Sequence, residues 1–245
     1  MHMRKKKWSR PELAACPYYF PEAEAQRGRW TSCFAHPEQP LELELGCGKG
    51  VSTAQMVHAF PEVNFIAIDI SPDVLGCARR NIEEAYQGEP VRNVALTRCD
   101  IEHIERFFAP EDPVRCIYIH FCNPWTARPR QHRRRLTHPR QLMQYRTFLA
   151  DGGEIRFKTD DEQLFRESLQ YFAVCGFEMI YRTDDLHQSG YTPNFQSEHE
   201  LKFSAAGMPI HFAIFRKLPG EVILSEEQRR LWHMQEKDET EETEP

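Results

Sequence analysis

The stretch LELELGCGKG, residues 41–50, decides the fold of this chain. Its first half alternates apolar and acidic residues, as a strand does, and its second half places glycines at positions 46, 48 and 50. A second apolar run, NFIAI at residues 64–68, ends at Asp69. A strand, a glycine turn, a helix and a second strand closed by an acidic residue are typical of a nucleoside-binding α/β unit. Glycine spacing alone would also fit a turn that merely packs a helix on a strand, so the prediction depends on the whole pattern.

The residues around the glycines indicate which nucleoside is bound. Dinucleotide-binding turns read GxGxxG, whereas the third glycine here, Gly50, arrives one position earlier. Glu44 precedes Gly46 by two residues, and its negative charge would repel a pyrophosphate. A sulfonium is cationic and carries no phosphate, so the sequence favours S-adenosyl-L-methionine over NAD. A structural turn with a solvated Glu44 is the remaining alternative.

Apolar patterning along the rest of the chain alternates between strands and helices. We expect strands near residues 41–46, 63–70, 92–98, 114–121 and 151–158, and helices near residues 50–60, 73–86, 101–108, 139–149 and 161–175. Two further strands, 177–183 and 211–216, follow with no convincing helix between them, so we expect them to pair antiparallel at the sheet edge. The predicted fold class is α/β: a doubly wound, mostly parallel, Rossmann-like methyltransferase sheet with an antiparallel C-terminal edge hairpin.

Composition bounds the class of protein. A chain of 245 residues is long enough for one large domain with its own core. Its eight cysteines are scattered without a CxxC pair, as expected in a reducing compartment. The sequence contains no apolar run of about 18 residues, which a membrane helix would need, and no signal-peptide pattern. We therefore expect a cytoplasmic protein without a membrane partner, and the spacing of His and Cys predicts no metal site.

Charge divides the chain into three parts. Much of the net charge of −6 comes from the last ten residues, 236–245, which hold six acids against Lys237. We predict a basic N-terminal extension (1–35), a methyltransferase domain (36–218), and a C-terminal helix with an acidic, disordered tail (219–245). The basic run Arg4-Lys5-Lys6-Lys7 beside Trp8 is expected to contact RNA phosphates, the alternative being a solvated terminus.

Residues that follow the strands are candidates for the ligand site, because ligands of such sheets bind outside the carboxyl ends of the strands. In chain order these candidates are Gly46, Gly48, Gly50, Asp69, Asp100, Asn123-Pro124-Trp125 and Lys158-Thr159-Asp160-Asp161. Asp69 can accept both ribose hydroxyls of an adenosine, and Asp100 can accept from its amino group. An aspartate at a strand-to-helix turn can also simply cap the helix, and for Asp100 this alternative stays open.

The most specific segment is FCNPWTARPRQHRRRL, residues 121–136. It follows the fourth strand and combines an aromatic residue with a series of arginines. The residues expected to bind substrate are Trp125, Arg128, Arg133 and Arg134. Arginine forks bind phosphates and planar bases, so the segment predicts a polyanionic partner such as RNA. The alternative is a solvated basic loop, although this run lies at the ligand edge of the sheet and not on an amphipathic face.

Taken together, these motifs resemble those of the bacterial tRNA (guanine-N7-)-methyltransferases. That family has a Glu before GxGxG, an Asp-Pro-Trp followed by Lys and a His/Arg-rich run, a Thr-Asp, and a late Thr-x-x-Glu. This chain has Glu44 before its glycines, Asn123-Pro124-Trp125 followed by HRRR at 132–135, Thr159-Asp160, and Ser197-Glu198-His199-Glu200. The likeness spans roughly residues 1–218.

The resemblance implies an S-adenosyl-L-methionine-dependent enzyme that methylates nitrogen-7 of the guanosine at position 46 in the tRNA variable loop. It implies a cofactor site lined by Glu44, Asp69, Asp100 and Asn123. It also implies that Asp160 and the stretch from Ser197 to Glu200 hold the guanine. Three positions depart from the family pattern: Asn123 stands for Asp, Ala127 for Lys, and Ser197 for Thr.

Asn123 is compatible with catalysis, because guanine nitrogen-7 carries a free lone pair and its methylation needs no general base. The rate depends on in-line placement of that lone pair and on stabilising the positive charge that develops on the base. Asp160 and Glu200 are the candidate carboxylates for this task, and Asn123 is expected to add a hydrogen bond. We therefore predict Asn123, Asp160 and Glu200 as catalytic residues.

Two other functions remain open from the sequence. Asn-Pro-Trp resembles the Asn-Pro-Pro-aromatic loop of methyltransferases that act on exocyclic amino groups of nucleic-acid bases, although the second proline is missing. Asn123 and Ala127 would also fit a paralogue that binds tRNA and cofactor without turnover. The sequence leaves the choice between monomer and homodimer open.

Overall fold

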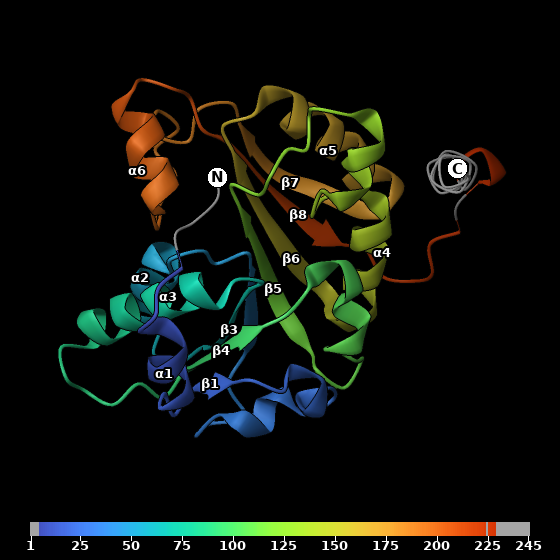
Figure 1. Cartoon of the computed structure of the whole chain (residues 1–245). Helices are drawn as coiled ribbons and strands as arrows, with labels where there is room; N and C mark the ends of the chain where they lie inside the picture. Colours follow the sequence, from blue (N-terminus) through green and yellow to red (C-terminus); the bar gives the residue numbers. More distant parts are fainter. Residues whose placement is uncertain (1–4, 224, 229–245) are drawn as a thin grey trace, which may run out of the picture.

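The computed structural model describes residues 5–223 and 225–228. Within these residues, one mixed sheet contains eight strands in the order β1-β4-β3-β2-β5-β6-β8-β7 (Figure 1). The strands are β1 (Tyr19–Phe20), β2 (Leu41–Leu45), β3 (Asn64–Asp69), β4 (Val94–Arg98), β5 (Val114–His120), β6 (Leu149–Thr159), β7 (Phe177–Thr183) and β8 (His211–Lys217). The strands from β1 to β6 pair in parallel, and β8 is antiparallel to both β6 and β7.

Helices cover both faces of this sheet. The α-helices are α1 (Ser9–Ala14), α2 (Val51–Ala59), α3 (Pro72–Tyr86), α4 (Pro139–Phe148), α5 (Glu162–Val174) and α6 (Glu198–Ala205). Short 3-10 helices are η1 (Ala23–Gln26), η2 (Trp30–Cys33), η3 (Ile101–Arg106) and η4 (Pro129–Arg134). Figure 1 shows α1, α2 and α3 on one side of the sheet and α4 and α5 on the other. Each side has its own core of buried apolar side chains.

The strand β3 illustrates why the central strands read as continuous apolar runs. Its Phe65 and Ala67 belong to the core beneath α2 and α3, whereas Ile66 and Ile68 belong to the core beneath α4 and α5. Side chains alternate between the two faces of a strand, so a strand covered on both faces needs apolar residues at every position. The run then ends at Asp69, where the strand reaches the ligand edge.

The predicted doubly wound, mostly parallel sheet with an antiparallel C-terminal pair is confirmed. The helix predicted near residues 101–108 is the 3-10 helix η3, in which His103 departs from helical geometry. One local prediction is wrong, because a helix, α6, does lie between β7 and β8. The residue that α6 buries is the acidic Glu200, so this helix shows little of the apolar periodicity by which helices are predicted.

The N-terminal residues contribute a helix, a strand and core side chains that the sequence did not predict. The strand β1 pairs with β4, and α1 packs on α3. Trp30 is fully buried, and its indole N–H donates to the Phe107 carbonyl at 2.8 Å. Asp112 accepts from the backbone N–H groups of Gly28 and Trp30 at 2.6 and 2.9 Å. These residues share the core of the larger domain, and an RNA-contacting role for residues 1–35 stays a prediction.

Most of the region 219–245, with its predicted helix and acidic tail, lies outside the described residues. In the part of the chain that is described, helices long and apolar enough to cross a lipid bilayer are absent.

Candidate functional site

The three glycines of the turn between β2 and α2 have different structural roles. Gly46, Gly48 and Gly50 have φ angles of +75°, +56° and +67°, a conformation that favours glycine. A Cβ at Gly50 would lie 2.6 Å from the Cβ of Ala78 in α3, so this glycine allows α2 and α3 to approach each other. A Cβ at Gly46 or Gly48 would have no neighbour closer than 3.9 Å. These two glycines keep the backbone open toward the end of the sheet.

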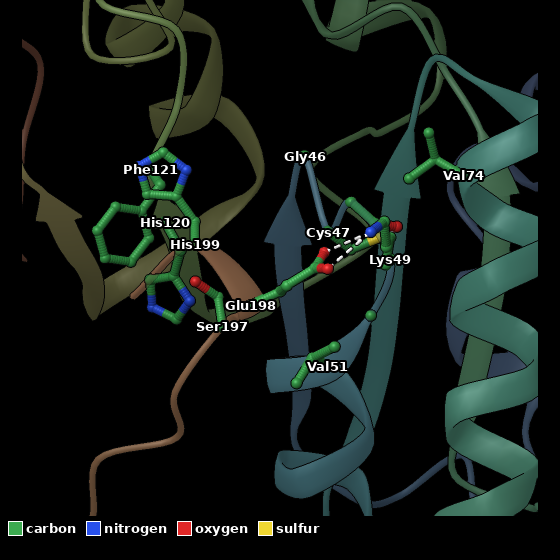
Figure 2. Close-up of a pocket in the computed structure, with 12 residues that line it drawn as sticks. Gly46, Cys47, Lys49, Val51, Val74, His120, Phe121, Ser197, Glu198 and His199 are labelled. Atoms are coloured by element: carbon green, nitrogen blue, oxygen red, sulfur yellow. Dashed lines mark hydrogen bonds and ion pairs between the residues drawn. The ribbon is translucent and has the colours of Figure 1, made fainter. Parts of the chain in front are cut away.

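Two cavities adjoin this turn and share Gly46 and Phe121 as walls. The first, of about 260 Å³, lies between the glycine turn, the end of β5 and the start of α6. Figure 2 shows its side-chain walls, which include Val74, His120, Phe121, Ser197, Glu198 and His199. The second, of about 280 Å³, is lined by residues at or after the ends of β3, β4 and β5, among them Asp69, Asp100, Asn123, Trp125 and Arg134. The ends of neighbouring strands therefore meet at one site.

Asp69 and Asp100 both lie in the second cavity and both make structural hydrogen bonds. Asp69 accepts from the Gly48 N–H at 3.1 Å and the Ser71 N–H at 2.8 Å, so it holds the glycine turn. Burial raises the pKa of Asp69, and these backbone donors oppose the rise. Asp100 caps η3 by accepting from the Glu102 N–H at 3.1 Å and still lines the cavity. Asp100 can therefore cap η3 and also face a bound ligand.

Glu44 lies beneath the glycine turn and lines neither cavity. Its side chain is 3% exposed, and its oxygens accept from Ser52 Oγ at 2.8 Å and from Thr53 Oγ1. His120 Nδ1 lies 3.5 Å from the same carboxylate. Burial, followed by the charge of Lys158, lowers the pKa of His120. Glu44 thus joins the first turn of α2 to the end of β5.

The loop after β5 has unusual backbone conformations on both sides of Asn123. Phe121 and Trp125 have φ angles of +52° and +49°, which are costly for residues with a Cβ. Asn123 Oδ1 accepts from the Trp125 N–H at 3.0 Å and closes a tight turn between them. This conformation leaves Asn123 exposed at the second cavity and makes Phe121 a wall of both cavities.

Two basic residues after this loop have structural tasks. Arg135 is fully buried, where it donates to the Pro124 carbonyl at 2.7 Å and pairs with Glu167 of α5. His138 is buried and caps α4 by accepting from the Arg140 N–H at 3.2 Å. Arg135 belongs to the segment 121–136 that was interpreted as RNA-binding, and this interpretation is wrong for Arg135, because burial makes it inaccessible to a polyanion.

The other arginines of the run remain candidates for RNA contact. Arg134 lies over the Trp125 ring, with its guanidinium carbon 5.3 Å from the ring centre, and both residues line the second cavity. Arg128 is exposed immediately before η4, and Arg133 is half-buried on that helix. Of the predicted arginines, the structure therefore brings Arg134 to a cavity wall.

Asp160 meets the start of α6 beside the first cavity. His199 Nε2 lies 3.3 Å from Asp160 Oδ1, and His199 itself lines the cavity. Ser197 caps α6 by accepting from the Glu200 N–H at 3.1 Å. Glu200 is fully buried, and Lys158 Nζ lies 3.1 Å from its carboxylate. The structure places Ser197 at the cavity wall, Asp160 next to that wall, and Glu200 behind it.

Several lining residues were not predicted. His120 and Phe121 stand at the carboxyl end of β5, so the rule used for the aspartates would have identified them. The same rule covers Lys49, which lies between Gly48 and Gly50, but not its ion pair: Lys49 Nζ pairs with Glu198 at 2.6 Å, and these residues are far apart in the sequence (Figure 2). Among the described residues, no group of three or more His, Cys, Asp or Glu is placed to hold a metal ion.

Comparisons with known proteins show the family of the chain. Residues 38–213 match a family model described as "Putative methyltransferase". A tRNA (guanine-N(7)-)-methyltransferase of Clostridium perfringens (strain SM101 / Type A) is 50% identical over 220 residues, covering 89% of this chain and 100% of the relative. The protein of the same name from Clostridium beijerinckii is 48% identical, covering 89% of this chain and 99% of the relative.

A solved structure supports the fold independently. The N-methyltransferase NodS from Bradyrhizobium japonicum WM9 aligns with a TM-score of 0.50 at 17% identity, covering 81% of this chain and 96% of that chain. At this identity the likeness concerns the fold alone, whereas the Clostridium relatives match at close to half of the aligned positions over their full length. The chain therefore belongs to the family of the tRNA (guanine-N(7)-)-methyltransferases.

Proposed function

We propose that this chain transfers a methyl group from S-adenosyl-L-methionine to nitrogen-7 of the guanosine at position 46 in the tRNA variable loop. Membership of the family supports methyl transfer as the reaction class. The main observation in support of this proposal is that two sets of residues line adjoining cavities. One set is the glycine turn with Asp69 and Asp100, and the other is Asn123 with the start of α6.

The two cavities fit the cofactor. Asp69 and Asp100 place carboxylates in the second cavity, where they would accept from the ribose hydroxyls and the adenine amino group. Gly46 and Gly48 leave the backbone bare toward the first cavity, which suits the amino-acid end of the cofactor. When bound, S-adenosylmethionine would supply an electrophilic methyl group. Glu44 supports this site from below, since direct contact would require it to leave Ser52 and Thr53.

The residues around the first cavity fit a purine base. Methylation at nitrogen-7 leaves positive charge on guanine, and a carboxylate close to the base stabilises that charge. Of the two predicted carboxylates, Asp160 is better placed than Glu200, because it contacts His199 at the cavity wall. Asn123 lines the adjoining second cavity, and its Oδ1 is engaged with the Trp125 N–H, which leaves its amide nitrogen to donate toward a ligand there. A direct contact between Glu200 and the base would require Glu200 to leave the protein interior.

The surface around the second cavity fits tRNA. Trp125 with Arg134 offers an aromatic ring and a guanidinium side by side, a combination suited to a base and a phosphate. Arg128 and Arg133 extend the positive charge along η4. A cytoplasmic location is part of the proposal, and the eight free thiols fit a reducing compartment.

The test is methyl transfer from labelled S-adenosylmethionine to an unmodified tRNA transcript, beside the same transcript with adenosine at position 46. Label on the first transcript alone, with aniline cleavage at that position after reduction, is the expected result. Label that resists this cleavage would indicate the exocyclic-amino alternative. If neither transcript is labelled while calorimetry shows cofactor binding, the chain is a binding paralogue and the proposed reaction is wrong.

A further inference from the structure

The ammonium group of Lys158 is enclosed in the protein and saturated with acceptors. Lys158 lies near the end of β6, and its side chain is 6% exposed. Its Nζ donates to Asn194 Oδ1 at 2.5 Å, to the Phe195 carbonyl at 3.1 Å and to Glu200 Oε2 at 3.1 Å. An ammonium has three N–H donors, so each N–H of Lys158 has one acceptor. All three acceptors come from one segment, residues 194–200, which we call the clamp segment.

Glu200 completes this buried network. Its carboxylate has no exposed surface, and its second oxygen accepts from Asn194 Nδ2 at 2.7 Å. His187 Nε2 lies 3.3 Å from that same oxygen. A buried charge that loses its partner is strongly destabilising, so Lys158 and Glu200 hold each other in place. The pair therefore connects the end of β6 to the first turn of α6.

Other polar contacts of the clamp segment lie at the surface, while Phe195 packs against Phe60, with ring centres 5.5 Å apart. Lys49 pairs with Glu198 at 2.6 Å, but these side chains are 38% and 60% exposed. Gln55 Nε2 donates to the Gln196 carbonyl at 2.8 Å from an exposed position. Exposed pairs contribute little to stability, whereas a buried pair is geometrically demanding. Among its polar contacts, those with Lys158 therefore do most to position the clamp segment, beside the packing of Phe195 on Phe60.

The clamp segment carries residues that form the site. Ser197, Glu198 and His199 all line the first cavity, and His199 contacts Asp160. Asp160 lies two residues after Lys158 in the chain, so one short stretch provides both the interior cation and the neighbouring carboxylate. We infer that Lys158 is a positioning residue, which holds the clamp segment through Asn194, Phe195 and Glu200 and so places Ser197 and His199 at the base-binding cavity. The inference deepens the proposed function and depends on it for the tRNA measurements.

The first experiment compares Lys158→Met with a matched control, Lys217→Met, in the full chain. Lys217 also has a largely buried side chain, 12% exposed, and pairs with Asp151 at 3.0 Å, at the opposite end of β6. Lys158→Met is expected to raise amide hydrogen exchange in residues 187–200, with β2 to β5 unchanged. Misplacing the segment should lower kcat/KM for tRNA by about 100-fold. Lys217→Met should leave both the exchange of residues 187–200 and kcat/KM unchanged. Equal effects of the two variants would show that Lys158 is merely structural.

A double-mutant cycle tests whether Lys158 acts on the site through Glu200. If Lys158 acts by holding Glu200, then Lys158→Met combined with Glu200→Gln should be no worse in kcat/KM than Lys158→Met alone, because both changes break the same pair. Independent, multiplicative losses would overturn the inference.

A milder variant covers the case in which Lys158→Met does not fold. Asn194→Ala removes one acceptor of Lys158 and one donor to Glu200 but leaves these two charges paired. It should raise exchange in residues 187–200 and lower kcat/KM to a smaller extent. Wild-type exchange and kinetics in Asn194→Ala would contradict the inference. The exchange measurements need no tRNA, so they decide the role of Lys158 even if the wild type forms no 7-methylguanosine.

Discussion

The ligand edge of the sheet consists of two halves that are fixed by different forces. The turn half comprises residues 44–50 with Asp69, and glycine φ angles and backbone N–H groups determine its shape. The clamp half comprises Lys158, Asp160 and residues 187–200, and buried side-chain charges determine its shape. We therefore expect substitutions that add atoms to affect mainly the turn half, and substitutions that remove a charge to affect mainly the clamp half.

The largest effect is expected in the clamp half from Asp160→Asn, which removes a charge and adds no volume. Loss of the carboxylate that stabilises the cationic base should lower the rate of methyl transfer by about 100-fold or more, as for other groups that stabilise transition-state charge. Single-turnover methylation of tRNA measures this rate. Asp151→Asn is the control, because Asp151 is 65% exposed and lies at the other end of β6. A loss common to both variants would contradict the assignment.

The next effect should arise in the turn half from Gly50→Ala. The new Cβ would lie 2.6 Å from Ala78 Cβ at a φ of +67°, so the free energy of unfolding should fall by about 3 kcal/mol. Urea denaturation measures this change. Gly48→Ala has the same sign of φ but room for a Cβ, so it should cost less stability and instead weaken cofactor binding in calorimetry. Equal stability losses would show that crowding at Ala78 is unimportant.

A smaller effect is expected where the two halves meet, at His120. Its pKa is lowered from 6.5 by burial and Lys158, while the carboxylates of Glu44 and Glu200 act against this shift. The unfolded chain therefore binds more protons, so the free energy of unfolding should fall as the pH drops through about 6.5. His120→Gln should lose less stability than the wild type between pH 7.5 and 5.5. Urea denaturation at both pH values measures this, and identical losses would show that His120 is not the cause.

The smallest effect should come from Asn123→Asp, which restores the residue of the family pattern. An aspartate Oδ1 can still accept from the Trp125 N–H, and nitrogen-7 needs no base, so kcat should change by less than about fivefold, the equivalent of one hydrogen bond. Steady-state methylation of tRNA measures kcat. Abolished turnover in Asn123→Asp would show that the amide itself is required.

The two halves also differ in how far the sequence predicts them. The glycines and Asp69 were predicted, because a turn with positive φ and a carboxylate after a strand leave a local pattern of residue types. In the clamp half, Asp160 was predicted because it follows a strand and Ser197 was found through resemblance, whereas the role of Lys158 and the burial of Glu200 were missed. Lys158 and Glu200 are 42 positions apart, and neither residue type indicates burial.

The sequence by itself determined the alternation of strands and helices, the glycine turn and the order of polar residues along the ligand edge. These features depend on backbone conformation and on periodic burial, which act over a few neighbouring residues. The tertiary structure alone decided which charges are enclosed. It buried Arg135 against Glu167 and Glu200 against Lys158, and left Arg134 beside Trp125 at the cavity. The environment of a charge is set by segments that meet only after folding, so local sequence does not encode it.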